Sequence, residues 1–315
     1  MFRKTKIGLA LGAGGARGLA HIGVLKAMER VGIRISFISG SSIGALVGGL
    51  YAHCLNAAEL ENLVPEIMNN DFFRKAGLPL MRQVFHDQPE GFSQRLETFI
   101  KKAYVQALIA TRPAILDTST FKAMIDYIVP DINIEDLPLP FCALSTDLRS
   151  GRPVLFRHGP LRDAIYASTA IPGAISPLKM NNLLLADGGI LNMVPVQPLF
   201  SMGADLVYAV NVEMEALFKG NESNMKAIDI LYRIEDIKSD VLKEAQLNAA
   251  NLVLSPKLGR IHWSDFSRAT EMIQIGYDEI IKCLDEMRNL ARRRIFPLKN
   301  RKKFKMEFAF DWIEI

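Results

Sequence analysis

The sequence predicts an α/β fold of three layers, an α/β/α sandwich with a mainly parallel central sheet. Two observations carry this prediction. The order strand, loop, helix occurs twice within the first 55 residues, and such a repeat is typical of parallel β-α units. Short aliphatic segments then recur later in the chain, at 141–148, 183–186, 205–212 and 251–254. Segments of this kind predict further buried strands of the same sheet.

The first two β-α units can be read residue by residue. Ile7–Leu11 is a short aliphatic strand, and Ala20–Val31 carries apolar residues at helical spacing. A second strand is expected at Ile35–Ile38. The following helix, Ile43–Leu55, is apolar on nearly every side, which predicts a helix inside the core.

Residues 57–129 contain no convincing strand. Their periodicity predicts helices over Glu59–Met68, Phe92–Leu108 and Thr120–Val129. We interpret this region as a helical insertion over the active site, where such segments often act as a lid or a pocket wall.

Strands resume in the second half of the chain. Phe141–Leu148 and Pro153–Phe156 are expected to pair as a hairpin through Arg149-Ser150-Gly151. The remaining predicted elements are a short helix at Arg162–Ala167, strands at Leu183–Ala186, Asp205–Val212 and Asn251–Leu254, a helical turn at Val196–Met202, and helices at Met225–Ala249 and Phe266–Leu290.

The chain length of 315 residues and the lack of a low-complexity linker predict a single domain over residues 1–295. A basic and apolar tail, residues 296–315, follows it. The end of this tail, Phe308–Ile313, is apolar enough to add a strand to the domain.

The composition indicates in which cellular compartment the protein is expected. The three cysteines, Cys54, Cys142 and Cys283, are far apart and odd in number, which favours a reducing environment over a disulfide framework. No apolar run reaches the ~18 residues of a membrane-spanning helix. The basic start and the apolar Ile7–Leu11 resemble a signal peptide, but the run is shorter than the ~7–15 residues that a signal requires. We therefore expect a cytoplasmic protein.

The net charge of +4 is unevenly distributed. Arg288–Lys305 holds nine basic residues and no acid, so the remainder of the chain has a net charge of −5. With apolar residues interspersed, this segment predicts peripheral contact with an anionic membrane; a solvated basic tail is the alternative. Aromatic residues are sparse there, so we expect no nucleic-acid partner. The sequence gives no indication of the oligomeric state.

The stretch Gly40-Ser41-Ser42-Ile43-Gly44 fits G-x-S-x-G, the nucleophile elbow, with Ser42 at its centre. A serine on a sharp strand-to-helix turn brings neighbouring backbone very close, so positions 40 and 44 need residues without bulk. The helix that begins at Ile43 would point free N–H groups toward Ser42. A simple Gly/Ser turn is the alternative interpretation.

A glycine-rich loop follows the first strand, with Gly12, Gly14, Gly15 and Gly18. A dinucleotide-binding loop would need a third glycine where Arg17 stands, and an acidic residue ~20 residues further on. Both are missing. The alternative is that the N–H groups of Gly14, Gly15 and Ala16 form an oxyanion hole, with Arg17 anchoring the loop.

A nucleophilic serine needs a base. Asp187-Gly188-Gly189 follows an aliphatic strand, where ligand crevices open in parallel sheets; an Asp-Gly turn is the alternative. His262 lies downstream of Asp187, as in an ordinary triad, and His21 lies close to the glycine loop. Each histidine also fits a packing or surface role, which would leave Asp187 to act on Ser42 directly. A further block, Ala167-Ser168-Thr169-Ala170-Ile171-Pro172, is uninformative by itself.

Taken together, these four blocks resemble the patatin-like phospholipase family in order and approximate spacing, over about residues 5–215, and most closely its bacterial stand-alone branch. The resemblance implies a Ser–Asp dyad, with Ser42 as nucleophile and Asp187 as general base. It also implies an oxyanion hole at Gly14, Gly15 and Ala16 with Arg17 beside it, the motif glycines Gly12, Gly18, Gly40, Gly44, Gly188 and Gly189, and no metal or cofactor.

The implied activity is hydrolysis of lipid carboxylic esters, of a phospholipid or a lysophospholipid, through an acyl-enzyme. A carboxylate with an ordinary pKa near ~3.9 is a weak base, so we expect burial to raise the pKa of Asp187. Two alternatives stay open: a thioesterase or acyltransferase that acts on thioester-linked acyl chains, and a non-catalytic regulatory member of the family.

Overall fold

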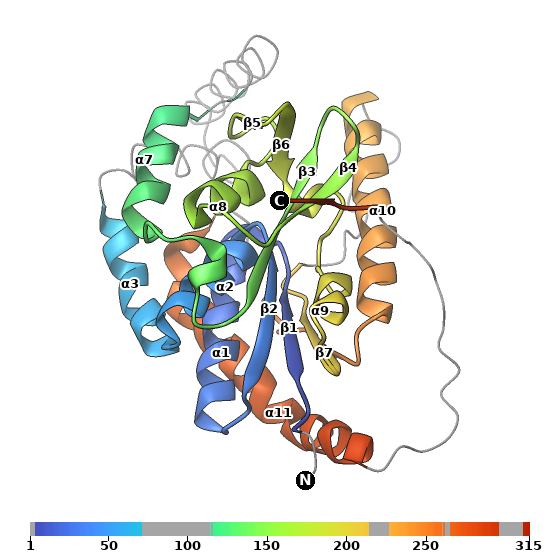
Figure 1. The fold of residues 1–315 in the computed structure, drawn as a ribbon. Helices are drawn as coiled ribbons and strands as arrows, with labels where there is room; N and C mark the ends of the chain where they lie inside the picture. The colour runs from blue at the N-terminus through green and yellow to red at the C-terminus, as the bar shows by residue number, and fades with distance from the viewer. Residues whose placement is uncertain are drawn as a thin grey trace, which may run out of the picture.

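The structure is a computed structural model, which describes residues 4–70, 114, 116–213, 227–259, 261, 265–295 and 311–315 (Figure 1). The described strands form one nine-stranded sheet, in the order β5-β6-β3-β2-β1-β7-β8, with β4 paired to β3 and β9 paired to β4. The strands are β1 (Ile7–Leu11), β2 (Ile35–Ser41), β3 (Phe141–Asp147), β4 (Arg152–Phe156), β5 (Leu178–Met180), β6 (Leu183–Asp187), β7 (Leu206–Val210), β8 (Leu252–Leu254) and β9 (Ile313–Glu314).

The strand pairs β1/β2, β1/β7, β2/β3 and β7/β8 are parallel, whereas β3/β4, β3/β6 and β5/β6 are antiparallel. The expected mainly parallel sheet is therefore confirmed. The expected hairpin of β3 and β4 is confirmed as well, and β9 pairs with β4, so the end of the chain does add a strand.

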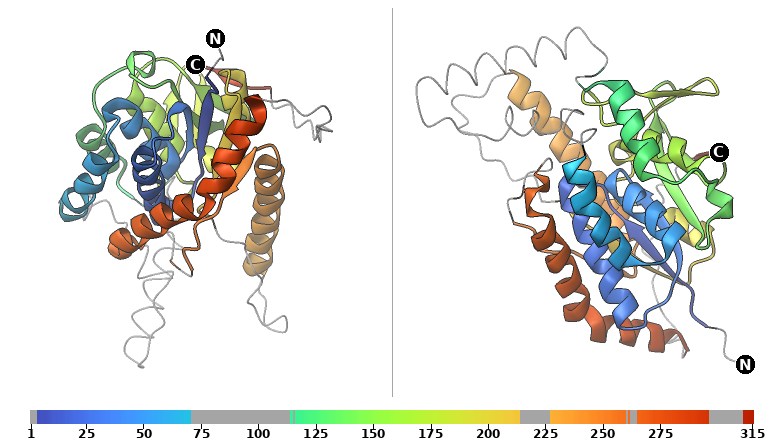
Figure 2. Two further views of the ribbon diagram at one scale, coloured as in Figure 1. Left: turned by 90° about the horizontal axis from the view of Figure 1, so that it is seen from below. Right: turned by 90° about the vertical axis from the view of Figure 1, so that its left-hand side faces the viewer.

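Helices cover both faces of the sheet, which gives the predicted three layers (Figure 2). Leu9, Leu11 and Ile38 face a large core cluster, which includes residues of the helices on one side. Ala10 and Phe37 point to the other face, where Leu199 of the short helix α9 packs. The helices are α1 (Ala20–Arg30), α2 (Ile43–Cys54), α3 (Ala57–Asn69), α7 (Thr118–Ile128), α8 (Leu161–Thr169), α9 (Gln197–Ser201), α10 (Ala227–Asn248) and α11 (Ala269–Ile295), with single 3₁₀ turns η1 (Gly15–Leu19), η2 (Ile134–Asp136), η3 (Gly188–Ile190) and η5 (Phe266–Arg268).

The helix α11 crosses α1 at very short range, and two glycines allow this. A Cβ on Gly23 would lie 1.8 Å from the carbonyl oxygen of Ile273, and one on Gly276 would lie 2.0 Å from that of Ala20. Any side chain at either position would separate the helices. This contact holds α1, and with it the glycine loop that precedes α1, against the body of the domain.

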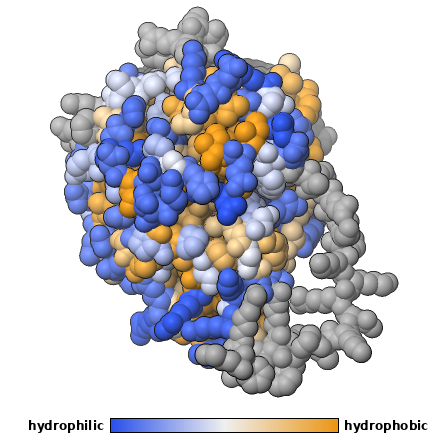
Figure 3. Space-filling view, in the orientation of Figure 1, coloured by the Kyte–Doolittle hydropathy of each residue, from blue (hydrophilic) through white to orange (hydrophobic). Residues whose placement is uncertain are grey.

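The helix α10 is attached mainly through its C-terminal half. Gln246 donates from Nε2 to the carbonyl oxygen of Leu191 at 2.7 Å and accepts from the N–H of Val194 at 2.9 Å. Five apolar side chains nearer its N-terminus are instead exposed, and apolar surface is visible at the upper right of Figure 3. They are 45–58% exposed: Ile230, Leu231, Ile234, Ile237 and Val241.

Two local predictions need correction. Strand β2 continues to Ser41 rather than stopping at Ile38, because β3 pairs with residues 38–41 and overrides the weak strand preference of Gly and Ser. Strand β5 was not predicted at all. It forms a hairpin with β6 through Asn181 and Asn182, whose φ angles of 43° and 67° match the type I′ turn that asparagine favours.

Part of the predicted helical insertion is described, as α3 and α7. The expected helix at Phe92–Leu108 and most of the basic segment, from residue 296 to Lys305, lie outside the described residues. Within the described chain, no helix is both long and apolar enough to cross a bilayer.

Candidate active site

Ser42 occupies a strained turn between β2 and α2. Its φ of 54° and ψ of −125° lie in a region that non-glycine residues rarely adopt, at a cost of ~1–3 kcal/mol. The turn is held from both sides. The carbonyl oxygen of Ser42 accepts from the N–H groups of Ala45 and Leu46, and its own N–H donates to Ser168 Oγ at 2.9 Å.

The two motif glycines are required by close backbone approach. A Cβ on Gly40 would lie 2.4 Å from the carbonyl oxygen of Gly44, and a Cβ on Gly44 would lie 2.2 Å from that of Leu11. Real Cβ atoms do not approach backbone so closely. The reason predicted for these glycines is thus confirmed: the elbow folds back onto its own strand and onto the end of β1.

The hydroxyl of Ser42 contacts the carboxylate of Asp187. Ser42 Oγ donates to Asp187 Oδ2 at 2.6 Å, while Asp187 Oδ1 accepts from the N–H of Gly189 at 2.7 Å. Both residues are only 6% exposed. The carboxylate is therefore fixed by its own turn and aimed at the serine.

Asp187 reaches Ser42 by a route that differs from the expected one. It ends β6, but β6 runs antiparallel to β3, and Asp187 pairs there with Ser145. The crevice rule for parallel strands, on which the prediction relied, does not apply to this strand. Asp187 meets the carboxyl end of β2 because it pairs with Ser145, and the preceding residue of β3, Leu144, pairs with Ser41.

Burial raises the pKa of Asp187 from its ordinary value of 3.8 to about 6, while the hydrogen bonds from Ser42 and Gly189 act in the opposite direction. The expected upward shift is confirmed. At neutral pH the carboxylate is still mostly ionised, and it holds a proton more strongly than an ordinary aspartate.

The glycine loop lies directly against this pair. A Cβ on Gly18 would lie 2.2 Å from Ile43 Cγ2, and one on Gly189 would lie 3.1 Å from Ala13 Cβ. Gly15, with a φ of 57°, starts η1. The first N–H groups of a helix have no acceptor within it, so those of Gly15 and Ala16 are suited to bind an anion.

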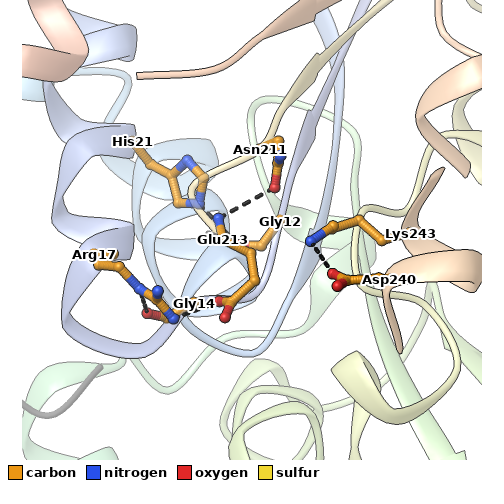
Figure 4. Close-up of polar contacts among 8 residues, drawn as sticks. All are labelled: Gly12, Gly14, Arg17, His21, Asn211, Glu213, Asp240 and Lys243. Carbon is orange, nitrogen blue, oxygen red and sulfur yellow. Dashed lines mark hydrogen bonds and ion pairs between the residues drawn. The ribbon is translucent and has the colours of Figure 1, made fainter. Parts of the chain in front are cut away.

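Side chains from three elements hold the loop (Figure 4). Arg17 donates from Nε to the carbonyl oxygen of Gly14 at 3.3 Å, and its Nη2 forms an ion pair with Glu213 Oε2 at 2.6 Å. His21 contacts the carbonyl oxygen of Gly12 through Nε2 at 2.8 Å. Burial lowers the pKa of His21 to about 4, so its ring is neutral and Nε2 is the donor.

No described histidine is placed to serve as the base. His21 uses Nε2 on the loop, and His53 and His158 are exposed. His262 lies outside the described residues. Likewise, no group of three or more metal-ligating side chains occurs in the part of the chain that the structure describes.

The sequence did not predict the roles of two polar residues of the site, Ser168 and Glu213. Ser168 is fully buried at the end of α8 and accepts from the N–H of Ser42, and the carbonyl oxygen of Ala170 accepts from the N–H of Asp187 at 2.9 Å. The block considered uninformative therefore contacts both Ser42 and Asp187. Glu213, the partner of Arg17, carries no recognisable motif, so no signal in the sequence pointed to it.

Comparisons with known proteins show the family of this chain. The patatin-like phospholipase family model matches residues 9–200. An uncharacterized NTE family protein of Mycobacterium tuberculosis is 38% identical over 208 residues, which cover 66% of this chain and 49% of that protein. Lysophospholipase NTE1 of Yarrowia lipolytica is 34% identical over 208 residues, 65% of this chain and 12% of that protein.

The chain thus spans about half or less of the length of these curated relatives. Among solved structures, human GIVD cytosolic phospholipase A2 shares the fold, with a TM-score of 0.50 and 10% identity over 92% of this chain and 60% of that one. Because the family model covers more than half of the sequence, the chain belongs to the patatin-like phospholipase family.

Proposed function

We propose that this chain is a serine hydrolase that cleaves carboxylic esters of lipids, a phospholipid or a lysophospholipid, through a Ser–Asp dyad. The observation that carries the proposal is the 2.6 Å contact from Ser42 Oγ to Asp187 Oδ2 on a strained elbow. Such strain persists only where the surrounding structure maintains it, and it is common at catalytic residues. The family, and the name of the fungal lysophospholipase, support a lipid ester as substrate.

In the proposed acylation step, Asp187 accepts the hydroxyl proton while Ser42 Oγ attacks the ester carbonyl carbon. Negative charge develops on the carbonyl oxygen, where the N–H groups of Gly14, Gly15 and Ala16 would receive it. The intermediate then collapses: the bond to the alcohol oxygen breaks, and Asp187 returns the proton to that oxygen. The products are an acyl-enzyme and a free alcohol, such as a lysophospholipid.

Deacylation repeats the sequence with water. Asp187 takes a proton from the water as it attacks the acyl carbon, and the proton then passes to Ser42 Oγ as the fatty acid leaves. The raised pKa of Asp187, about 6, suits both directions of transfer, because a base works best when its pKa lies near the operating pH.

The test is hydrolysis of a panel of phospholipids, lysophospholipids and acyl thioesters by the purified chain, its Ser42→Ala variant and its Asp187→Asn variant. We expect ester hydrolysis by the wild type only, and labelling of Ser42 by a fluorophosphonate probe. Preference for the thioesters would favour the thioesterase or acyltransferase alternative. No turnover together with no labelling of Ser42 would favour a regulatory protein.

We also propose that the basic residues from Arg288 to Lys305 bring the enzyme to anionic lipid surfaces. Removing residues 296–315 is a poor test, because it would also remove β9, which pairs with β4. Replacing Lys299, Lys302, Lys303 and Lys305 by glutamine keeps that strand. The proposal predicts weaker flotation of this variant with anionic vesicles; unchanged flotation would contradict it.

A further inference from the structure

We propose that Glu213 is a positioning residue for the glycine loop, whose N–H groups would bind the oxyanion, and that it acts through Arg17. The inference rests on the proposed function, since the loop matters for catalysis only if it binds the oxyanion. Glu213 lies just after β7 and is 196 positions from Arg17 in the sequence, yet the two side chains form an ion pair of 2.6 Å (Figure 4).

The first step is the orientation of one peptide group. Arg17 Nε donates to the carbonyl oxygen of Gly14 at 3.3 Å. In a trans peptide the C=O of one residue and the N–H of the next point in opposite directions. By holding the Gly14 carbonyl, Arg17 therefore sets the direction of the Gly15 N–H, one of the donors proposed for the oxyanion.

The second step is the orientation of Arg17 itself. Its side chain is 8% exposed, so water does little to hold it. A guanidinium is a rigid plane with donors along its edges. Fixing Nη2 on Glu213 while Nε binds Gly14 determines the position of the whole plane. Without the carboxylate, only the 3.3 Å bond would remain among the contacts described for this guanidinium.

The third step is the anchoring of Glu213. Its N–H donates to Asn211 Oδ1 at 3.1 Å. The neighbouring Val212 lies directly on the loop, because a Cβ on Gly14 would be 2.7 Å from Val212 Cγ2 and 3.5 Å from Glu213 Oε2. The loop thus lies directly against the residues that follow β7.

The pKa of Glu213 is raised overall, and its cationic neighbours oppose the rise. Burial raises the pKa of Glu213, whereas Arg17 and then Lys243 lower it. Lys243 is itself only 8% exposed and forms an ion pair with Asp240 at 2.7 Å. Two cations and two carboxylates therefore meet where η1, β7 and α10 converge, and the carboxylate of Glu213 is the one bound to the loop.

The test begins with Glu213→Gln, which keeps the shape of the side chain and removes its charge. Donors that act only in the transition state change kcat rather than KM. We expect kcat for ester hydrolysis to fall about 10- to 100-fold, the effect of displacing a group by ~1 Å, with KM changed less than about twofold. The matched control is Glu271→Gln in the exposed pair with Arg268, which should keep wild-type kinetics.

If Glu213 had a purely structural role, its replacement would also lower the free energy of unfolding. The decisive readout is therefore whether the effects of two substitutions on kcat are additive. Arg17→Lys keeps the charge but not the planar fork, and it should lower kcat by itself. If Glu213 acts through Arg17, adding Glu213→Gln to Arg17→Lys should lower kcat no further. Equal effects of Glu213→Gln in both backgrounds, or wild-type kcat in the single variant, would overturn the inference.

Ser42→Ala in the same series separates the two proposals. If Ser42→Ala matches the wild type, the proposed function fails and the role of Glu213 fails with it. If Ser42→Ala is inactive and Glu213→Gln is fully active, only the role of Glu213 fails. Should Glu213→Gln not fold, Arg17→Lys alone decides, and retention of wild-type kcat by this variant contradicts the inference.

Discussion

Replacing Asp187 by asparagine should stabilise the protein while it removes activity. The carboxylate is 6% exposed, and burial raises its pKa from 3.8 to about 6. Asparagine has the same shape and keeps an oxygen that can accept from the N–H of Gly189. The variant removes a buried negative charge, and its Nδ2 can donate to Ser42 Oγ at the position where the carboxylate accepted.

The magnitude follows from the pKa shift. A folded-state pKa of about 6 against 3.8 is a shift of about two units, or ~3 kcal/mol at ~1.4 kcal/mol per unit. Because the folded pKa is the higher one, this stability is fully present below about pH 3.8 and is lost as the pH rises through about 6. Asparagine does not titrate, so the variant does not lose it.

Urea unfolding of the wild type and Asp187→Asn, from about pH 4 to about pH 8, measures the effect. The difference in the free energy of unfolding should grow with pH by up to ~3 kcal/mol in favour of the variant. Asp311→Asn is the control, since that side chain is 91% exposed. A difference that stays constant with pH, or shrinks, would refute burial as the cause of the shift.

Two further predictions concern the site. The kcat/KM of ester hydrolysis should rise with pH through an inflection near 6, as Asp187 ionises. The His21→Gln variant should retain this inflection, because the pKa of His21 is about 4. Loss of the inflection in this variant would assign it to the histidine. Ser168→Ala should lower the free energy of unfolding by ~1–3 kcal/mol, the cost of leaving the buried N–H of Ser42 unpaired. Unfolding and kcat should be measured on the same variant, and wild-type values of both would contradict the prediction.

Local patterns in the sequence predicted much of the fold. The bounds of β1 were predicted without error, and those of α1 and α2 to within one residue. Their signals are local, since helical periodicity and glycine breaks act within a few residues. The need for Gly40 and Gly44 was also predictable, because a tight strand-to-helix turn excludes side chains wherever it occurs.

Other elements depend on partners that are remote in the chain. Strand β5 has three residues and exists because it pairs with β6. The extension of β2 to Ser41 depends on pairing with β3. Short segments such as these have no periodicity of their own, so tertiary pairing decides them.

The features of the site also fall into those predictable from local sequence and those that depend on tertiary contacts. The sequence by itself determined which residues are candidates: Ser42 on an elbow, Asp187 before two glycines, and a glycine loop with exposed N–H groups. Only the tertiary structure decided how they meet. The contacts of Ser42 with Asp187 and Ser168, and of Arg17 with Glu213, join residues 126 to 196 positions apart. Burial, which raises the pKa of Asp187, is likewise a property of the packed molecule, because it depends on which atoms exclude water from the carboxylate.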